Sequence, residues 1–202
     1  MTYISYKSLF KKKEKKQKNR AFFVFFLVDY DTKILYIDFM SEEKYVRPTW
    51  DEYFMEVART IAKRATCDRG RSGCVIARDN QILVTGYVGS PAGLPHCDDV
   101  GHLFRKSVHE DGSITNHCVR TVHAEQNAIC QAAKRGISID GGTVYCKMTP
   151  CRTCAMLIIN CGIKRVVCEK HYHDEEDSMR IFKEAGVKIE HLEDSVQTYK
   201  DM

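Results

Sequence analysis

The sequence of 202 residues lacks any long hydrophobic run. The longest, AFFVFFLV at residues 21–28, is far too short to span a bilayer, and no small-residue cleavage site follows it. Internal repeats are also missing, as is a linker that would divide the body of the protein into two domains. Hydrophobic residues make up 44% and charged residues 29%, the balance of an ordinary globular domain. We therefore expect a cytoplasmic protein without a membrane partner.

A strong excess of positive charge is missing from most of the chain. Residues 1–20 hold eight Lys or Arg and a single acidic residue. The other 182 residues hold 23 basic and 26 acidic side chains, a net charge of −3. Proteins that bind nucleic acid usually present a strongly basic surface, so we expect no stable nucleic-acid partner.

The first 39 residues differ from the rest in composition. A basic stretch precedes the apolar run, and Lys, Phe, Tyr and Ile, which AT-rich codons specify, are abundant. We interpret residues 1–39 as an N-terminal tail, and we hypothesise that the start is mis-called and native translation begins at Met40. Residues 49–192 are then the folded domain, and residues 193–202 are a C-terminal tail.

Apolar periodicity predicts alternating helices and strands after residue 49. Residues 51–66 have helical spacing with Asp51 able to cap, and residues 72–87 read as a β-hairpin. Polar residues 96–117 are expected to be an irregular insertion. Further helices are predicted at residues 124–136, 150–162 and 175–186, and strands at residues 141–148, 164–169 and 187–192. This order predicts an α/β fold, a three-layer αβα sandwich with a mixed sheet of about five strands.

Cysteine, in contrast, is abundant, with ten residues. In a chain of this length without a secretory signal, clustered cysteines favour metal-bound thiolates over disulfides. Cysteines with apolar neighbours are interpreted as small buried side chains: Cys74, Cys130, Cys146, Cys161 and Cys168. Histidines outside the clusters are interpreted as solvated or hydrogen-bonded: His96, His109, His171, His173 and His191.

Two predicted helices begin with metal-ligating residues, in the motifs HAE and PCRTC. Cys151 and Cys154 lie three residues apart, so a helix directs both sulfurs to one side, and its first turn favours thiolates. With His123 they supply three ligands, which leaves one position of a tetrahedral zinc open, as in catalytic sites. Glu125 is then a neighbour of the activated water and a candidate proton carrier.

H-x-E followed by P-C-x-x-C is the signature of zinc nucleobase deaminases. The chain resembles the cytidine/deoxycytidylate deaminase superfamily, and most closely the deoxycytidylate (dCMP) deaminases, in WDEYFMEVA, GYVGSPAG, HCVRTVHAEQNAI, GGTVYCKMTPCRTCA and GIKRVV. The resemblance implies a cytidine deaminase-like fold, a catalytic zinc on His123, Cys151 and Cys154, and proton transfer by Glu125. The implied reaction hydrolyses dCMP to dUMP and ammonia, which supplies thymidylate synthesis. A homo-oligomer, dCTP and dTTP as allosteric effectors, and Mg²⁺ with the nucleotide effector are also implied.

One departure from the family concerns the substrate. Members usually read GYNG, and their Asn helps to hold the nucleotide, whereas this sequence reads GYVG. Val88 can donate no side-chain hydrogen bond, so the departure affects substrate identity more than reaction type. The other candidate substrate contacts are the backbone of Gly86, Gly89, Ser90 and Gly93, Arg120 as a phosphate ligand and Tyr172 as a stacking aromatic.

A second set of cysteines and histidines surrounds the polar insertion. Some dCMP deaminases carry a structural zinc fed by residues in comparable places, and the insertion has too few apolar residues for a core of its own. We predict a closed four-ligand zinc site at Cys67, Cys97, His102 and Cys118, with His117 as the alternative to Cys118. Ordinary surface histidines and buried cysteines are the open alternative.

Three hypotheses for function follow. The leading one is dCMP deamination, and the second is the same chemistry on another cytosine nucleoside or nucleotide or on a tRNA base. The charge of −3 over residues 21–202 argues mildly against a tRNA substrate. The third is a non-catalytic zinc-binding module in DNA uptake. Glu125 argues against it, because such a module needs no carboxylate beside an open metal position.

Overall fold

The computed structural model describes residues 24–28, 34–38, 45–108, 112 and 114–197. Contacts divide the chain into two units, residues 1–47 and 48–202. In the first unit, β1 (Val24–Val28) and β2 (Ile34–Asp38) pair antiparallel, so part of the segment that we interpreted as a tail contains paired strands. The hypothesis of a native start at Met40 lies outside the described residues.

The second unit is built on a mixed five-stranded sheet, as predicted, and its strand order is β4-β3-β7-β8-β9. The hairpin of β3 (Gly73–Arg78) and β4 (Gln81–Tyr87) is confirmed; its turn residues Asp79 and Asn80 both have positive φ, as a type I′ turn requires. Antiparallel pairing joins β3 to β7, and parallel pairing joins the last three strands. Those strands are β7 (Thr143–Met148), β8 (Arg165–Lys170) and β9 (Lys188–His191).

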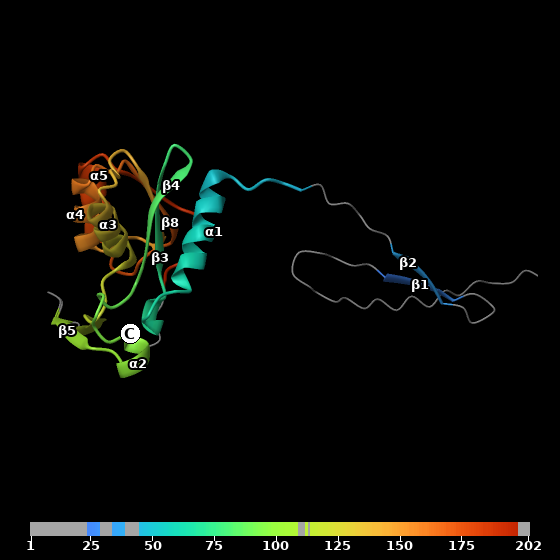
Figure 1. The fold of residues 1–202 in the computed structure, drawn as a ribbon, viewed down its shortest axis with the longest axis horizontal. Coiled ribbons are helices and arrows are strands. Elements are labelled where there is room, and N and C mark those ends of the chain that lie inside the picture. The colour runs from blue at the N-terminus through green and yellow to red at the C-terminus, as the bar shows by residue number, and fades with distance from the viewer. Residues whose placement is uncertain (1–23, 29–33, 39–44, 109–111, 113, 198–202) are drawn as a thin grey trace, which may run out of the picture. The chain divides into compact units, whose positions relative to one another are not determined.

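Helices cover both faces of this sheet, which confirms the three-layer arrangement (Figure 1). One face carries α1 (Trp50–Ala62), whose Phe54 and Met55 pack with Val75 and Val167 of the sheet. The opposite face carries α3 (Ala124–Arg135), α4 (Arg152–Asn160) and α5 (Glu176–Glu184). Because both faces are covered, the central strands read as apolar runs rather than as alternating patterns.

The N-cap of the first helix differs from the predicted one. Thr49, not Asp51, is the N-cap of α1, and it forms a capping box with Glu52. Asp51 instead makes two 2.7 Å hydrogen bonds with the guanidinium of Arg165 and accepts one from the Tyr145 hydroxyl at 2.9 Å. Sequence periodicity could not show this role, because the partners lie about a hundred residues away along the chain.

The polar segment, expected to be irregular, contains regular structure. It forms α2 (Cys97–Val100) and the antiparallel pair β5 (Phe104–Val108) and β6 (Ile114–Cys118), at one end of the domain (Figure 1). All five side chains of β5 are exposed, so this hairpin contributes no core of its own. Within the described residues, no helix is long and apolar enough to cross a membrane.

The buried-cysteine interpretation holds for three of the five positions. Cys74, Cys146 and Cys168 are buried in the core between the sheet and α3, α4 and α5. Cys161 is partly buried, and Cys130 is exposed on α3, where the interpretation is wrong. Cys130 has apolar neighbours in the sequence, but its own side chain is exposed because consecutive helix positions point in different directions.

Candidate metal centre and substrate pocket

The starts of two helices bring three metal-ligating side chains together. His123 is the N-cap of α3, Cys151 is the N-cap of α4, and Cys154 lies in the first turn of α4. The Nδ1 atom of His123 lies 3.4 Å from the sulfur of each cysteine. Tetrahedral zinc, with bonds of about 2.0 Å to nitrogen and about 2.3 Å to sulfur, would place these atoms roughly 3.5 Å apart. The three donors therefore fit a zinc site with one open position.

Electrostatics at this cluster favour the thiolate form of Cys151, whereas the hydrogen bond with Cys151 raises the pKa of the Cys154 thiol. Hydrogen bonding from Cys154, followed by that from His123, lowers the pKa of the Cys151 thiol to about 4. Hydrogen bonding to Cys151 in turn raises the pKa of His123 to about 9. Both shifts favour a thiolate at Cys151 paired with a protonated His123. A metal ion would replace the imidazole proton as the positive partner.

Glu125 is the buried carboxylate of the site. It lies in the first turn of α3 with 6% of its surface exposed, and its Oε2 atom is 3.6 Å from the Cys154 sulfur. Burial raises the pKa of Glu125, and the neighbouring His123 partly opposes that effect. A buried carboxylate in a cleft, with its pKa raised, is a candidate to accept and return a proton, as a general acid–base catalyst must.

A pocket of about 210 Å³ opens onto this cluster. His123, Glu125 and Cys151 line it from the helix starts, and Val88 and Tyr172 line it from the neighbouring loops. Of the predicted substrate contacts, these last two therefore reach the pocket. The remaining predicted contacts do not line it: Gly86, Gly89, Ser90, Gly93 and Arg120.

For two of these residues the structure shows another contact. Gly86 packs against α3, where an added Cβ would lie 2.3 Å from the carbonyl oxygen of Ala124. Its lack of a side chain thus serves the packing of helix on sheet. The Arg120 guanidinium is directed elsewhere, since its Nε donates a 3.1 Å hydrogen bond to the carbonyl oxygen of Gly101.

Arg69 is a pocket residue that sequence reasoning missed. It lies in η1 (Asp68–Gly70), lines the pocket, and places its guanidinium carbon 5.1 Å from the centroid of the Phe104 ring. Its position two residues after Cys67 was the only available signal. A predicted metal ligand at Cys67 indicates that the following residues are held close to the site.

The second predicted ligand set also comes together. The ligand atoms of Cys67, Cys97, His102 and Cys118 all lie within 4.8 Å of one another. The sulfurs of Cys97 and Cys118 are 3.6 Å apart, and the Cys67 sulfur lies 3.7 Å from Nδ1 of His102. Tetrahedral zinc would set these separations at about 3.8 and 3.5 Å, so the donors fit a closed site.

Hydrogen bonds and ion pairs around this second cluster also favour Cys67, Cys97, His102 and Cys118 as the ligands. Nε2 of His102 lies 3.2 Å from Asp68 Oδ1, which leaves Nδ1 facing the cysteines. His117, the alternative ligand, instead hydrogen-bonds with the Thr115 hydroxyl at 2.9 Å and lines the pocket. Cys67 and Cys118 line the pocket as well, so the two clusters border one cavity.

The chain is similar to several known proteins. A family model described as "Cytidine and deoxycytidylate deaminase zinc-binding region" matches residues 48–170. ComE operon protein 2 of Bacillus subtilis is 40% identical over 147 residues, which cover 73% of each chain. Deoxycytidylate deaminase of Schizosaccharomyces pombe is 34% identical over 157 residues, 78% of this chain but only 48% of the relative.

A solved structure shares the fold. The dCMP deaminase of cyanophage S-TIM5, crystallised in complex with dCMP and dUMP, superimposes with a TM-score of 0.58 at 28% identity. The match covers 73% of this chain and all of the phage chain. The family match spans both helix starts that carry the HAE and PCRTC motifs. This chain therefore belongs to the cytidine and deoxycytidylate deaminase family.

Proposed function

We propose that this protein catalyses the hydrolytic deamination of dCMP to dUMP and ammonia, which supplies dUMP for thymidylate synthesis. The observation that carries the proposal is the buried carboxylate of Glu125, set in a pocket beside a three-donor cluster that fits zinc. Relatives named deoxycytidylate deaminase support the choice of substrate. We assign the catalytic domain to residues 49–192 and place it in the cytoplasm.

The chemistry divides between the metal and the protein. Zinc held by His123, Cys151 and Cys154 would supply a Lewis acid that makes water nucleophilic near neutral pH. Glu125 accepts a proton from the water that adds at C4 of the cytosine ring. It passes this proton to the ring nitrogen N3. It then takes the second proton from the new hydroxyl at C4 and delivers it to the amine, so that ammonia leaves and the C4 carbonyl of uracil forms. Its burial keeps bulk water from competing for those protons.

Arg69 is the group that we assign to the 5′-phosphate. Its guanidinium presents a fork of donors that matches a phosphate, and it lines the same pocket as Glu125. Arg120, the residue expected from sequence, lies outside the pocket lining. A nucleotide with its base at the metal cluster and its phosphate at Arg69 would span the pocket. Recognition of the phosphate would favour dCMP over deoxycytidine.

Val88 lines the pocket without a polar group, so the missing family Asn leaves one hydrogen bond to the substrate unmade. Tyr172 remains our candidate for stacking on the base, because it lines the same cavity. The backbone of Gly89 and Ser90 would then shape the loop rather than touch the nucleotide. We expect dCMP to bind without an amide contact at position 88.

The second cluster is proposed as a structural zinc site. Two of its donors, Cys67 and Cys118, border the pocket, so a metal there would fix the wall that carries Arg69 and His117. Regulation by dCTP and dTTP with Mg²⁺, and assembly as a homo-oligomer, are proposed on the family resemblance. Exposed apolar side chains on α4, Met156 and Leu157, support a surface for self-association.

A substrate panel tests the function. Ammonia release is measured with dCMP, CMP, deoxycytidine, cytidine and dCTP, with and without Mg²⁺ and the effectors dCTP and dTTP. We expect dCMP to give the highest kcat/KM, and equal rates with nucleosides would overturn the nucleotide assignment. The second candidate is a non-catalytic zinc-binding module, kept because a relative of 40% identity is named ComE operon protein 2 and not as a deaminase. Absence of activity on the whole panel would favour that module.

A further inference from the structure

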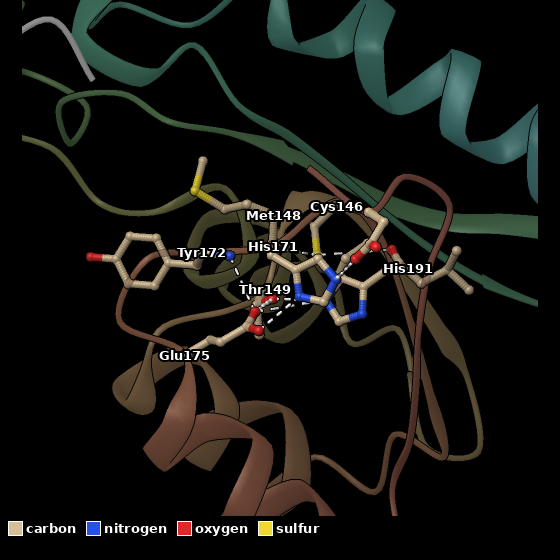
Figure 2. A network of polar contacts seen from close by, with 10 residues as sticks. Cys146, Met148, Thr149, His171, Tyr172, Glu175 and His191 are labelled. Carbon is tan, nitrogen blue, oxygen red and sulfur yellow. Dashed lines mark hydrogen bonds and ion pairs between the residues drawn. The ribbon is translucent and has the colours of Figure 1, made fainter. Parts of the chain in front are cut away.

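A third group of polar side chains lies beside the site, and the mechanism above does not use it. His171 follows β8, Glu175 is the N-cap of α5, His191 ends β9, and Thr149 lies between β7 and the metal-ligating Cys151. Figure 2 shows these side chains gathered around the Glu175 carboxylate. Thr149 is 1% exposed, so its hydroxyl needs partners within the protein.

The hydrogen bonds of this group determine which of its side chains donate and which accept. Glu175 Oε2 accepts from the Thr149 hydroxyl and, at 3.2 Å, from the backbone N–H of Tyr172. Glu175 Oε1 lies 2.7 Å from Nδ1 of His171, which must donate because a carboxylate only accepts. The Thr149 hydroxyl donates its only proton to Glu175. Its oxygen therefore accepts a hydrogen bond from Nε2 of His191, which lies 2.9 Å away.

The Glu175 carboxylate is therefore held ionised. Burial raises its pKa, but hydrogen bonds from Thr149, His171 and the Tyr172 backbone oppose burial and leave the pKa below its usual range. Three donors converge on the carboxylate. A neutral side chain of the same shape could not accept from all of them.

A metal site is the other reading of two histidines and a glutamate. Their ligand atoms do lie within 4.8 Å of one another. The imidazole rings of His171 and His191, however, are stacked, with centroids 3.7 Å apart and planes inclined by 13°. A ring nitrogen binds metal with a lone pair in the plane of its own ring, and one ion cannot lie in two parallel planes. Hydrogen bonding is thus the arrangement that the geometry favours.

The network joins two walls of the pocket. Thr149 and Cys151 line the pocket on the loop after β7, and Tyr172 lines it on the loop after β8. The backbone N–H of Thr149 also donates to the carbonyl oxygen of Lys170 at 3.1 Å. Glu175 bridges these loops by accepting from both. In Figure 2 the Tyr172 ring extends away from the network while its backbone N–H faces Glu175.

The segment assigned to a C-terminal tail closes the network from the other side. The backbone N–H of His171 donates to the carbonyl oxygen of Ser195 at 2.8 Å, and that of Gln197 donates to the carbonyl oxygen of His171 at 2.9 Å. Residues 193–197 thus hold His171 through a short parallel bridge between His171 and Val196. The position of the His171 ring is fixed by backbone as well as by stacking.

We propose that Glu175 is a positioning residue of the active site, which uses Thr149 and His171 to hold the metal-ligating loop and the Tyr172 wall in register. The proposal rests on the proposed function, because its consequence is read in the deamination of dCMP. Glu175 itself does not line the pocket and so touches no reacting atom. It acts through the residues that it holds.

Glu175→Gln is the primary test, with Glu176→Gln as the matched control. Both remove one negative charge from the start of α5, but Glu176 is exposed and its side chain makes no hydrogen bond or ion pair with the described residues. The amide introduced by Glu175→Gln would turn its own N–H₂ group towards N–H or O–H donors. We expect kcat/KM for dCMP to fall about 10- to 100-fold, with a higher KM and unchanged zinc content. Kinetics equal to those of Glu176→Gln overturn the proposal.

Thr149→Val and Thr149→Ser test the same link if Glu175→Gln fails to fold. Loss of the hydroxyl in Thr149→Val should lower kcat/KM, and Thr149→Ser should restore most of it. Equal kinetics for the two variants overturn the proposal. Inactivity of the wild type on the whole substrate panel would instead overturn the proposed function.

Nitrogen-15 NMR of the histidine rings reports which ring nitrogens are protonated, and this measurement does not depend on catalytic activity. We expect protonated Nδ1 at His171 and protonated Nε2 at His191 in the wild type, with the His171 signals shifted in Glu175→Gln. Protonation of His171 at Nε2 alone overturns the proposal. So does a third zinc per chain that Glu175→Gln removes, since that result would make the group a metal site.

Discussion

Replacement of Glu125 by glutamine separates the catalytic role of this residue from its structural role. The amide has nearly the same shape as the carboxylate, so it fits a side chain that is 6% exposed. It cannot carry protons, however. General acid–base groups typically contribute about 10²- to 10⁴-fold to the rate, or roughly 2.7–5.5 kcal/mol of transition-state stabilisation. We expect kcat for dCMP to fall by this factor, with little change in KM.

The same substitution should not weaken the fold. Burial raises the pKa of Glu125, so its charged form costs folding free energy at every pH above the pKa of the unfolded chain, about 4.3. Removal of the charge removes that cost, and the melting temperature of Glu125→Gln should equal or exceed that of the wild type.

The assay combines steady-state ammonia release with thermal unfolding at matched zinc content, and Glu176→Gln serves as the control. Full activity of Glu125→Gln would refute the assignment of proton transfer to this residue. A large loss of stability together with activity would show that Glu125 is structural. The decisive result is therefore a loss of activity without a loss of thermal stability.

Three further predictions concern the substrate, the second cluster and the fold. Arg69→Gln should raise KM for dCMP about 10- to 100-fold and leave deoxycytidine kinetics nearly unchanged, and a parallel loss on both substrates would contradict the phosphate assignment. Cys97→Ser should lower zinc content from two ions to one per chain, measured by atomic emission, with a lower melting temperature; two ions retained would exclude the second cluster. Asp51→Asn should cost about 1–2 kcal/mol in denaturant unfolding at pH 7, because it loses the partly buried pair with Arg165. Hydrogen bonding to Arg165 lowers the pKa of Asp51 in the folded state, so this contribution is present above about pH 4 and should vanish as pH falls through the lowered value.

The sequence alone predicted those parts of the site that depend on local geometry. Cys151 and Cys154 lie three residues apart at a helix start, so the spacing by itself converges their sulfurs. His123 and Glu125 open the preceding helix in the same way. The alternation of strands and helices predicted the mixed sheet, because the central strands are apolar and the helices amphipathic.

Tertiary structure decided the roles that depend on residues far apart in the chain. Only the folded chain shows that Asp51 pairs with Arg165, that Arg69 rather than Arg120 reaches the pocket, and that Gly86 serves packing against α3. The network around Glu175 is likewise assembled from β7, β8, β9 and α5. Periodicity and motif spacing report neighbours within about one helical turn, whereas these contacts join helices, strands and loops that come together only when the chain packs around the sheet.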